Sequence, residues 1–166
     1  IASGLPCNRA PFAGTVAVMG LLERHGKGDS FVKCAVLPSI KRAPMQAKVR
    51  EHVEGGSNVY SDAFLSYAGL SRDYFHKFIN HSESYAQGAV HTNGLENFWS
   101  LLKRSIKGTY VSVEPFHRFR YLDEQAFRFN HRNNTDRGRF MNALQSILGR
   151  RLSYAELIGN ELPQTC

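Results

Sequence analysis

Five bulky apolar residues recur at intervals of three and four along one stretch of the chain. This stretch limits the possible folds more than any other. The residues are Leu95, Phe98, Trp99, Leu102 and Ile106. At about 100° per residue they form one stripe, which predicts an amphipathic helix over residues 93–106, with Gly108 as a stop signal. Another layer must cover so wide a stripe, and 166 residues are enough for one domain with such a core.

The segments on either side of this helix alternate between strand-like and helix-like patterns. Apolar and β-branched runs predict strands over 15–23 and 31–37, which form a hairpin because a Gly-containing link joins them. The remaining expected elements are a helix over 44–53, a strand over 58–62, a helical turn or two over 63–70, a strand over 74–79, and helices over 115–131, over 139–148 and from Ser153 onward. Strands that alternate with helices predict an α/β fold, with helices packed on a sheet.

The excess positive charge lies in the last third of the chain. The formal net charge is +7, and residues 103–151 hold eleven Lys and Arg against four Asp and Glu. The rest of the chain has ten of each, so it is neutral overall. A basic face that is simply solvated would explain this distribution, and so would a surface that binds a polyanion such as nucleic acid. The aromatic residues between the arginines fit either interpretation.

Several classes of protein are excluded by what the chain lacks. Its longest apolar run, Ala13 to Leu22, is about half the roughly 20 residues that a membrane helix needs. The run has no basic lead-in and no small-residue cleavage site, which argues against a secretory signal. Three widely spaced cysteines, Cys7, Cys34 and Cys166, exclude a disulfide framework and a four-thiolate zinc site. We therefore expect a soluble intracellular protein.

Two carboxylates are the candidates for chemistry. Asp62 closes a predicted strand, and ligands of open α/β sheets bind at the carboxyl ends of strands. Glu96 lies in the first turn of the predicted helix, on the same flank as Lys103 and Lys107. Each carboxylate also has a structural interpretation: Asp62 as a helix N-cap, and Glu96 as the partner of Asn93 in a capping box. Carboxylates suit Mg²⁺ and Mn²⁺, although two acids are too few to hold two ions well.

The sequence around Glu96 resembles the signature of one group of bacterial insertion-sequence transposases. The stretch from His91 to Arg104, which reads HTNGLENFWSLLKR, carries the signature, and the resemblance is highly specific over residues 76–132. It continues through Gly108-Thr109-Tyr110, His117, Tyr121-Leu122-Asp123-Glu124 and Phe127-Arg128-Phe129-Asn130, and upstream it includes Tyr60-Ser61-Asp62 and Asn80-His81-Ser82. It covers residues 16–158. The group belongs to the DDE superfamily, in the branch related to eukaryotic Merlin elements.

This resemblance implies a fold, a reaction and a set of residue roles. The implied fold is a ribonuclease H-like domain, a mixed five-stranded sheet flanked by helices, in which three acids bind two divalent ions, Mg²⁺ or Mn²⁺. Asp62 matches the second acid, at the end of the fourth strand, and Glu96 matches the third, on the helix after the fifth strand. Lys103 matches a basic position expected to face DNA. The implied reaction is strand cleavage and strand transfer at insertion-sequence ends by metal-dependent phosphoryl transfer.

The first catalytic Asp of the family has no counterpart in this sequence. It belongs in an Asp-Glu-Thr-like segment on the first strand, whereas residues 1–14 contain no acid. Because the chain also begins at Ile1 and its first methionine is Met19, we expect an incomplete copy in which the first strand is missing or altered. If the chain is active unaided, Asp29 or Glu23 is the expected substitute.

The residues and the resemblance together predict a DDE-type transposase of the bacterial cytoplasm that acts as a homo-oligomer on double-stranded DNA, both element ends and target. We expect an irregular leader (1–15), a partial catalytic domain (16–158) and a C-terminal tail (159–166). The expected phosphate contacts are Lys103, Arg104, Lys107, Arg120, Arg128 and Arg132. Two alternatives stay open. One is a DNA-binding remnant without catalysis, and the other is a structural zinc protein, for which His76 and His81 are suitably spaced but lack a second pair.

Overall fold

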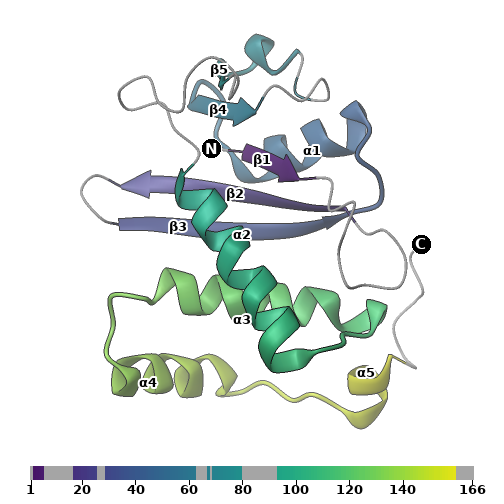
Figure 1. Cartoon of the computed structure of the whole chain (residues 1–166), viewed down its shortest axis with the longest axis vertical. Coiled ribbons are helices and arrows are strands. Elements are labelled where there is room, and N and C mark those ends of the chain that lie inside the picture. Colours follow the sequence, from purple (N-terminus) through teal and green to yellow (C-terminus); the bar gives the residue numbers. More distant parts are fainter. Residues whose placement is uncertain are drawn as a thin grey trace.

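The computed structural model of the chain describes residues 2–5, 17–25, 29–62, 67, 69–79 and 93–159 (Figure 1). Within these residues the protein is an α/β fold, as the alternating pattern predicts, with two small sheets and helices on both faces. No helix in this part of the chain combines the length and the apolar character that crossing a lipid bilayer requires.

The first sheet is antiparallel and has the strand order β1-β2-β3. The predicted hairpin is confirmed, because β2 (Ala17–His25) pairs with β3 (Asp29–Leu37) along its whole length. Within the expected irregular leader the structure instead has a strand, β1 (Ala2–Leu5), which pairs with residues 18–21 of β2. Its sequence, Ala-Ser-Gly-Leu, has weak strand propensity, so its order depends on the neighbouring edge of β2 rather than on local pattern. Residues 6–15 lie outside the described part.

The second sheet consists of β4 (Asn58–Asp62) and β5 (Phe75–Ile79), which run parallel, with Asp62 opposite Ile79. Both strands lie where the sequence predicts them, and a 3₁₀ turn, η2 (Leu70–Arg72), leads into β5. β1 lies beside β4, and their arrows point the same way in Figure 1. The five strands therefore follow the spatial order β3-β2-β1-β4-β5, with Asp62 at the carboxyl end of the strand next to β1.

β2 separates two hydrophobic clusters because its side chains alternate between the faces of the sheet. On one face Met19 and Leu21 belong to the same cluster as Met45 and Val49 of α1 (Arg42–His52). On the other face Leu22 belongs to the cluster formed with α2 (Asn93–Ser105). The apolar stripe predicted for this helix is confirmed, since all five of its residues are buried: Leu95, Phe98, Trp99, Leu102 and Ile106.

α2 lies very close to β2, and two glycines permit this approach. A Cβ added to Gly20 of β2 would lie 2.7 Å from a ring carbon of Trp99. A Cβ added to Gly94 of α2 would lie 2.7 Å from Leu22 Cδ2. Both distances are shorter than van der Waals contact, so a side chain at either position would push the helix and the sheet apart.

The end of α2 and the following helix differ slightly from the prediction. The helix does not stop at Gly108 but continues into a π-helical turn, η3 (Ile106–Tyr110). A 3₁₀ turn, η4 (Pro115–His117), then leads into α3 (Arg118–Asn130), which packs on the same face of the first sheet as α2. Pro115 sits in the first turn, as the sequence predicts, because its fixed φ suits that position.

Two short helices follow α3, and side-chain caps define where they begin. α4 (Asp136–Ile147) starts three residues before its predicted position because the Thr135 hydroxyl accepts a hydrogen bond from Gly138 N–H. α5 (Tyr154–Ile158) starts after Ser153, as predicted, where Ser153 and Glu156 form a capping box. α4 lies on the far side of α3 from the sheets in Figure 1.

Candidate functional site

Asp62 is held at the end of β4 by the pairing of β4 with β5. Directly before it, the fully buried Ser61 places its Oγ 2.8 Å from Nε2 of His76 on β5. Burial lowers the pKa of His76, so the neutral ring is favoured and can share this hydrogen bond. The sequence pattern does not indicate the Ser61–His76 contact, because the two residues lie on different strands and are 15 positions apart. The side chain of Asp62 lies outside the part of the chain that the structure describes.

Glu96 lies in the first turn of α2 and is exposed to solvent. The buried residues Leu95, Phe98 and Trp99 fix this turn against β2, so the helix presents Glu96 from a well-packed base. Ser100, Lys103 and Lys107, which the sequence places on the same flank, are exposed as well. The side chain of Asn93, the expected cap, lies outside the described residues.

A metal site shared by Asp62 and Glu96 stays a prediction, because the side chain of Asp62 is not described. Among the residues that the structure describes, no three or more His, Cys, Asp or Glu side chains come together as a group that could hold a metal ion. The histidine pair proposed for zinc is not tested either, since His81 lies outside these residues.

The six predicted phosphate contacts fall into two sets. Lys103 and Arg104 near the end of α2 and Lys107 in η3 are exposed, and none of them forms an ion pair within the described ranges. In a chain with an overall positive charge, such a cluster attracts polyanions.

The other three arginines, on or just after α3, contact groups of their own chain. Arg120 donates from Nη2 to the Glu156 carbonyl at 3.1 Å and lies over the rings of Phe116 and Phe119. Arg128 forms an ion pair with Glu124 at 2.8 Å. Arg132 donates to the Ser30 carbonyl at 3.0 Å. Arg120 and Arg132 thus hold α5 and β3 to α3, whereas Arg128 keeps a mostly exposed side chain.

Two parts of the signature sequence meet in space. The Tyr110 hydroxyl of η3 donates to Glu124 of α3 at 2.5 Å, and the rings of Tyr110 and Tyr121 are 4.6 Å apart, edge to face. The hydrogen bond to the Glu124 carboxylate raises the pKa of Tyr110, so the phenol stays protonated. Neither motif on its own indicates this contact, because the two residues are 14 positions apart. The contact links the turn that carries Lys107 to α3.

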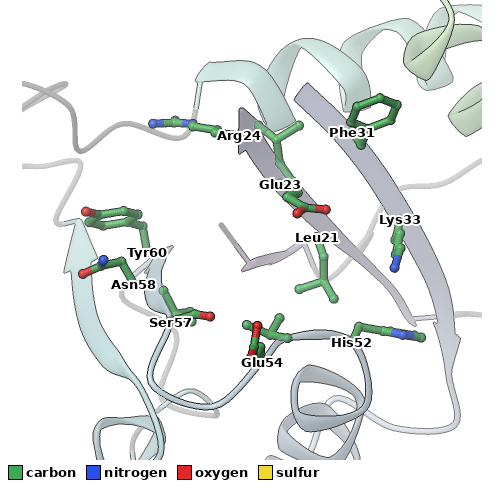
Figure 2. A pocket seen from close by; sticks show the side chains of 13 residues that line it. Leu21, Glu23, Arg24, Phe31, Lys33, His52, Glu54, Ser57, Asn58 and Tyr60 are labelled. Carbon is green, nitrogen blue, oxygen red and sulfur yellow. The ribbon is translucent and has the colours of Figure 1, made fainter. Parts of the chain in front are cut away.

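A pocket of about 560 Å³ lies on the α1 side of the first sheet, between β2 and the start of β4 (Figure 2). Its polar lining includes Glu23, Lys33, His52, Glu54 and Tyr60. Figure 2 shows Glu23 directed into this space on the same face as Leu21.

The pocket shows on which face of the sheet Glu23 lies. Glu23 and Asp29 are the two acids considered as substitutes for the first catalytic Asp of the family. Leu22, the neighbour of Glu23, points to the opposite face and meets α2 at Gly94. Glu23 therefore lies across the sheet from α2 and Glu96, which argues against Glu23 as the substitute acid. The side chain of Asp29 lies outside the described residues.

The family of this chain follows from its similarity to known proteins. The fold defines an α/β protein whose helix α2 ends in exposed basic residues. Residues 8–130 match the model of the ISXO2-like transposase domain, so the chain belongs to this family of insertion-sequence transposases. A Haemophilus influenzae protein described as an uncharacterized transposase-like protein is 36% identical over 100 residues, which are 60% of this chain and 80% of that protein. No solved structure gives a significant match.

The family match confirms the resemblance that the sequence signature indicated. The match runs from residue 8 to Asn130, the last residue of α3, and the expected domain limits of 16–158 stay a prediction. α4 and α5 therefore lie beyond the matched domain.

Proposed function

We propose that the chain acts in DNA transposition, in the metal-dependent cleavage and transfer of DNA strands at insertion-sequence ends. The observation that carries this proposal is the position of its two candidate acids. Asp62 ends the strand next to β1, and Glu96 lies in the first turn of the helix that packs on β2. A mixed set of five strands with helices on both faces also supports a ribonuclease H-like domain, the fold that the family resemblance implies.

The donor atoms of the proposed site suit Mg²⁺ or Mn²⁺, because both ions prefer carboxylate oxygens. Asp62 and Glu96 would hold the metal, which would supply an activated water and stabilise the oxygens of the phosphodiester. The protein's part is to present the two carboxylates from a paired strand and a packed helix. β1 is the candidate for the first strand of such a domain, in an altered form, because its four residues, Ala2–Leu5, supply no third carboxylate.

DNA is the partner that the exposed end of α2 supports. Lys103, Arg104 and Lys107 lie on the same helix as Glu96, so phosphates bound by them would pass near the proposed metal site. Arg128 is a further candidate because its side chain is 65% exposed. For Arg120 and Arg132 the intramolecular contacts make a DNA role secondary. Both element ends and target DNA are the expected substrates, in the bacterial cytoplasm.

The acid-free β1 supports a second candidate, a transposase relative that binds DNA without cutting it. This candidate keeps the basic end of α2 and requires no metal. It predicts DNA binding that is the same with Mg²⁺ as with a chelator, once ionic strength is matched.

A binding experiment tests the interface. Fluorescence anisotropy of a labelled duplex is measured from about 50 to about 200 mM salt for the chain and for the triple variant K103Q/R104Q/K107Q. Each lost phosphate contact lowers the salt slope by about 0.9, so the triple variant should lose roughly two to three from that slope. Lys41→Gln is the matched control, since Lys41 is exposed just before α1. An unchanged slope in the triple variant would refute this interface.

A cleavage experiment separates the two candidates. Duplexes from the DNA that flanks the coding sequence are incubated with Mn²⁺ and either this chain or a version with an Asp-bearing strand added upstream. Transposition chemistry predicts cutting that Asp62→Asn and Glu96→Gln abolish in whichever version is active. If neither version cuts while both bind DNA, the binding-only candidate is correct.

A further inference from the structure

The backbone of Val111 has an unusual conformation, at the point where the chain turns back between α2 and α3 (Figure 1). Among the residues that the structure describes, Val111 is the one residue other than glycine with a positive φ. Its φ is 59° and its ψ is −54°, and the N–H of Ser112 donates to the Tyr110 carbonyl at 2.5 Å. These values define a γ-turn centred on Val111, in its rare and strained form. Because valine is β-branched, this conformation destabilises the folded chain.

Contacts on both sides hold the chain in this turn. Before it, the Tyr110 hydroxyl donates to Glu124 of α3, and the Tyr110 ring packs on Tyr121. After it, Val113 is 5% exposed and belongs to the hydrophobic cluster that α2 and α3 share. The core therefore fixes both ends of the turn. Val111 is presented in one position, and little ordering is needed before it binds a partner.

The side chain of Val111 does not offset this strain by packing within its own chain. It is 72% exposed and belongs to neither hydrophobic cluster of the described residues. Glycine adopts a positive φ without strain and exposes no apolar side chain to water. Strained residues that the surrounding structure holds in place are concentrated where a protein binds a ligand. The position therefore indicates a contact of the Val111 side chain with another molecule.

The charges near Val111 indicate the chemistry of that molecule. Lys107 lies in η3, four residues before Val111, and Lys103 lies about one helical turn further back; both are exposed. The acid nearest in sequence is Glu114, and Glu124 already forms an ion pair within α3. Positive charge therefore predominates beside an exposed apolar tip. This combination suits a polyanion that carries apolar groups between its charges, as nucleic acid does.

An undistorted DNA duplex offers an apolar side chain one complementary group. This group is the 5-methyl of thymine in the major groove, because the base edges in the minor groove present only polar atoms. Phosphate contacts fix the position of a protein on the duplex, whereas contacts with base edges supply a sequence preference. Lys103 and Lys107 have the charge for the first kind of contact, and Val111 has the apolar surface for the second.

We propose that Val111 contacts thymine methyl groups in the major groove of the DNA whose phosphates Lys103, Arg104 and Lys107 bind. This inference rests on the proposed function, and it adds a preference for A·T base pairs to an interface that otherwise contacts phosphates alone. The contacts of Tyr110 and Val113 keep the side chain in position for the bases in spite of the strain in the turn.

Replacement of thymine by uracil tests this contact, because it removes only the methyl group. Fluorescence anisotropy measures binding of the whole chain to an A·T-rich duplex and to the same duplex with uracil in place of thymine. The wild type should bind the thymine duplex about fourfold more tightly for each methyl group that is buried. Val111→Gly should bind the two duplexes equally and keep the salt slope of the wild type, since it loses no phosphate contact. Phe75→Ser, which removes an exposed apolar side chain from β5, is the matched control and should keep the thymine preference.

Thermal unfolding of the same variants shows whether Val111 serves the fold instead. Val111→Gly should keep or raise the unfolding midpoint, because glycine adopts a positive φ without strain. A lowered midpoint together with an unchanged thymine preference would show that the side chain is structural and would overturn the inference.

The binding results also separate this inference from the proposed function. A wild-type chain that binds both duplexes equally overturns the thymine contact and leaves the DNA interface standing. Equal binding with a rise in the fluorescence of 2-aminopurine placed in the duplex would indicate that Val111 unstacks the bases, which also overturns the methyl contact. A chain that binds neither duplex overturns both the inference and the proposed interface.

Discussion

The side chain of Asn130 pairs with both backbone groups of Val32, in the way a neighbouring strand would. Val32 N–H donates to Asn130 Oδ1 at 2.7 Å, and Asn130 Nδ2 donates to the Val32 carbonyl at 3.0 Å. The last residue of α3 thus closes the outer edge of β3, 98 residues away in sequence. A planar amide is the one uncharged side-chain group that can donate and accept in this geometry.

Replacing Asn130 should weaken the attachment of α3 to the sheet. Asn130→Ala removes two partly buried hydrogen bonds and should lower the free energy of unfolding by about 2–3 kcal/mol. Asn130→Asp should be similarly unfavourable, because a carboxylate cannot donate to the Val32 carbonyl. Urea denaturation measures both. Asn142→Ala, on α4, is the matched control and should change stability little; an Asn130→Ala midpoint equal to wild type would contradict the role of this pair.

The Ser61–His76 contact predicts a pH dependence of stability. Burial lowers the pKa of His76 in the folded chain below its ordinary value of 6.5, so the unfolded chain binds the proton first as the pH falls. The contribution of the neutral His76 ring to the free energy of unfolding is therefore fully present above about pH 6.5, and it is lost progressively below that pH. His76→Gln can keep a hydrogen bond to Ser61 without titrating, and it should flatten the decline of the urea midpoint between pH 7 and 5. If His76→Gln leaves the decline as in wild type, another group causes it.

A side chain at Gly20 should destabilise the fold. A methyl group there would meet the Trp99 ring at 2.7 Å and Leu95 Cδ1 at 3.0 Å, and both partners are buried. Gly20→Ala should therefore cost about 1–3 kcal/mol through overpacking. Gly55→Ala provides the comparison, because nothing lies within 4 Å of its added Cβ. Equal denaturation midpoints for the two variants would be incompatible with the described approach of α2 to β2.

The thiol of Cys34 should react slowly while the protein is folded. Burial, and then the negative charge of Asp123, raise its pKa to about 12, compared with 9.0 in the absence of these effects. At pH 8 this change lowers the thiolate fraction roughly a hundred- to thousandfold, and alkylation requires the thiolate. Mass spectrometry of the Cys34 peptide after iodoacetamide treatment, with and without urea, measures the ratio of the alkylation rates in the unfolded and the folded chain. Similar rates in both conditions would show that Cys34 is accessible and ionised in the native state.

Glu96→Gln and Asp62→Asn should leave the fold intact if these acids serve chemistry rather than capping. Glu96 is exposed, so its neutral isostere should change stability by less than about 0.5 kcal/mol. A capping role predicts a loss of about 1 kcal/mol or more instead. Denaturation midpoints distinguish the two, and calorimetric titration with Mn²⁺ should show binding by the wild type that both variants lack.

The sequence predicted local elements well because their signals are local. The stripe at 95–106, the hairpin and the strand ending at Asp62 each depend on residues within one short window, and all were found. The relative placement of these elements was not predictable in the same way. Arg132 was a candidate for phosphate contact, but it donates to Ser30, 102 residues away. Nothing in the pattern around an arginine shows which carbonyl the fold will bring to it.

In the candidate site, too, local features were predictable from the sequence and contacts between distant residues were not. The signature sequence identified the family and both candidate acids, and the family match confirms the first of these. The contact between Tyr110 and Glu124 was beyond sequence reasoning, because a π-helical turn continues past Gly108 where a glycine usually ends a helix. The strand formed by Ala2–Leu5 was missed since its order depends on pairing with β2.

The glycine contact at the start of α2 also determines how accurately Glu96 is placed. Gly94 rests on Leu22 with no intervening side chain, and Glu96 follows two residues later in the same turn. The height of this carboxylate above the sheet is therefore set by the core, and not by the long connection between β5 and α2. Changes in that connection should leave Glu96 at the same height above the sheet, whereas a single methyl group at Gly94 should tilt the first turn of α2. Mutational tolerance around this acid should thus be highest in the connection and lowest beneath the helix.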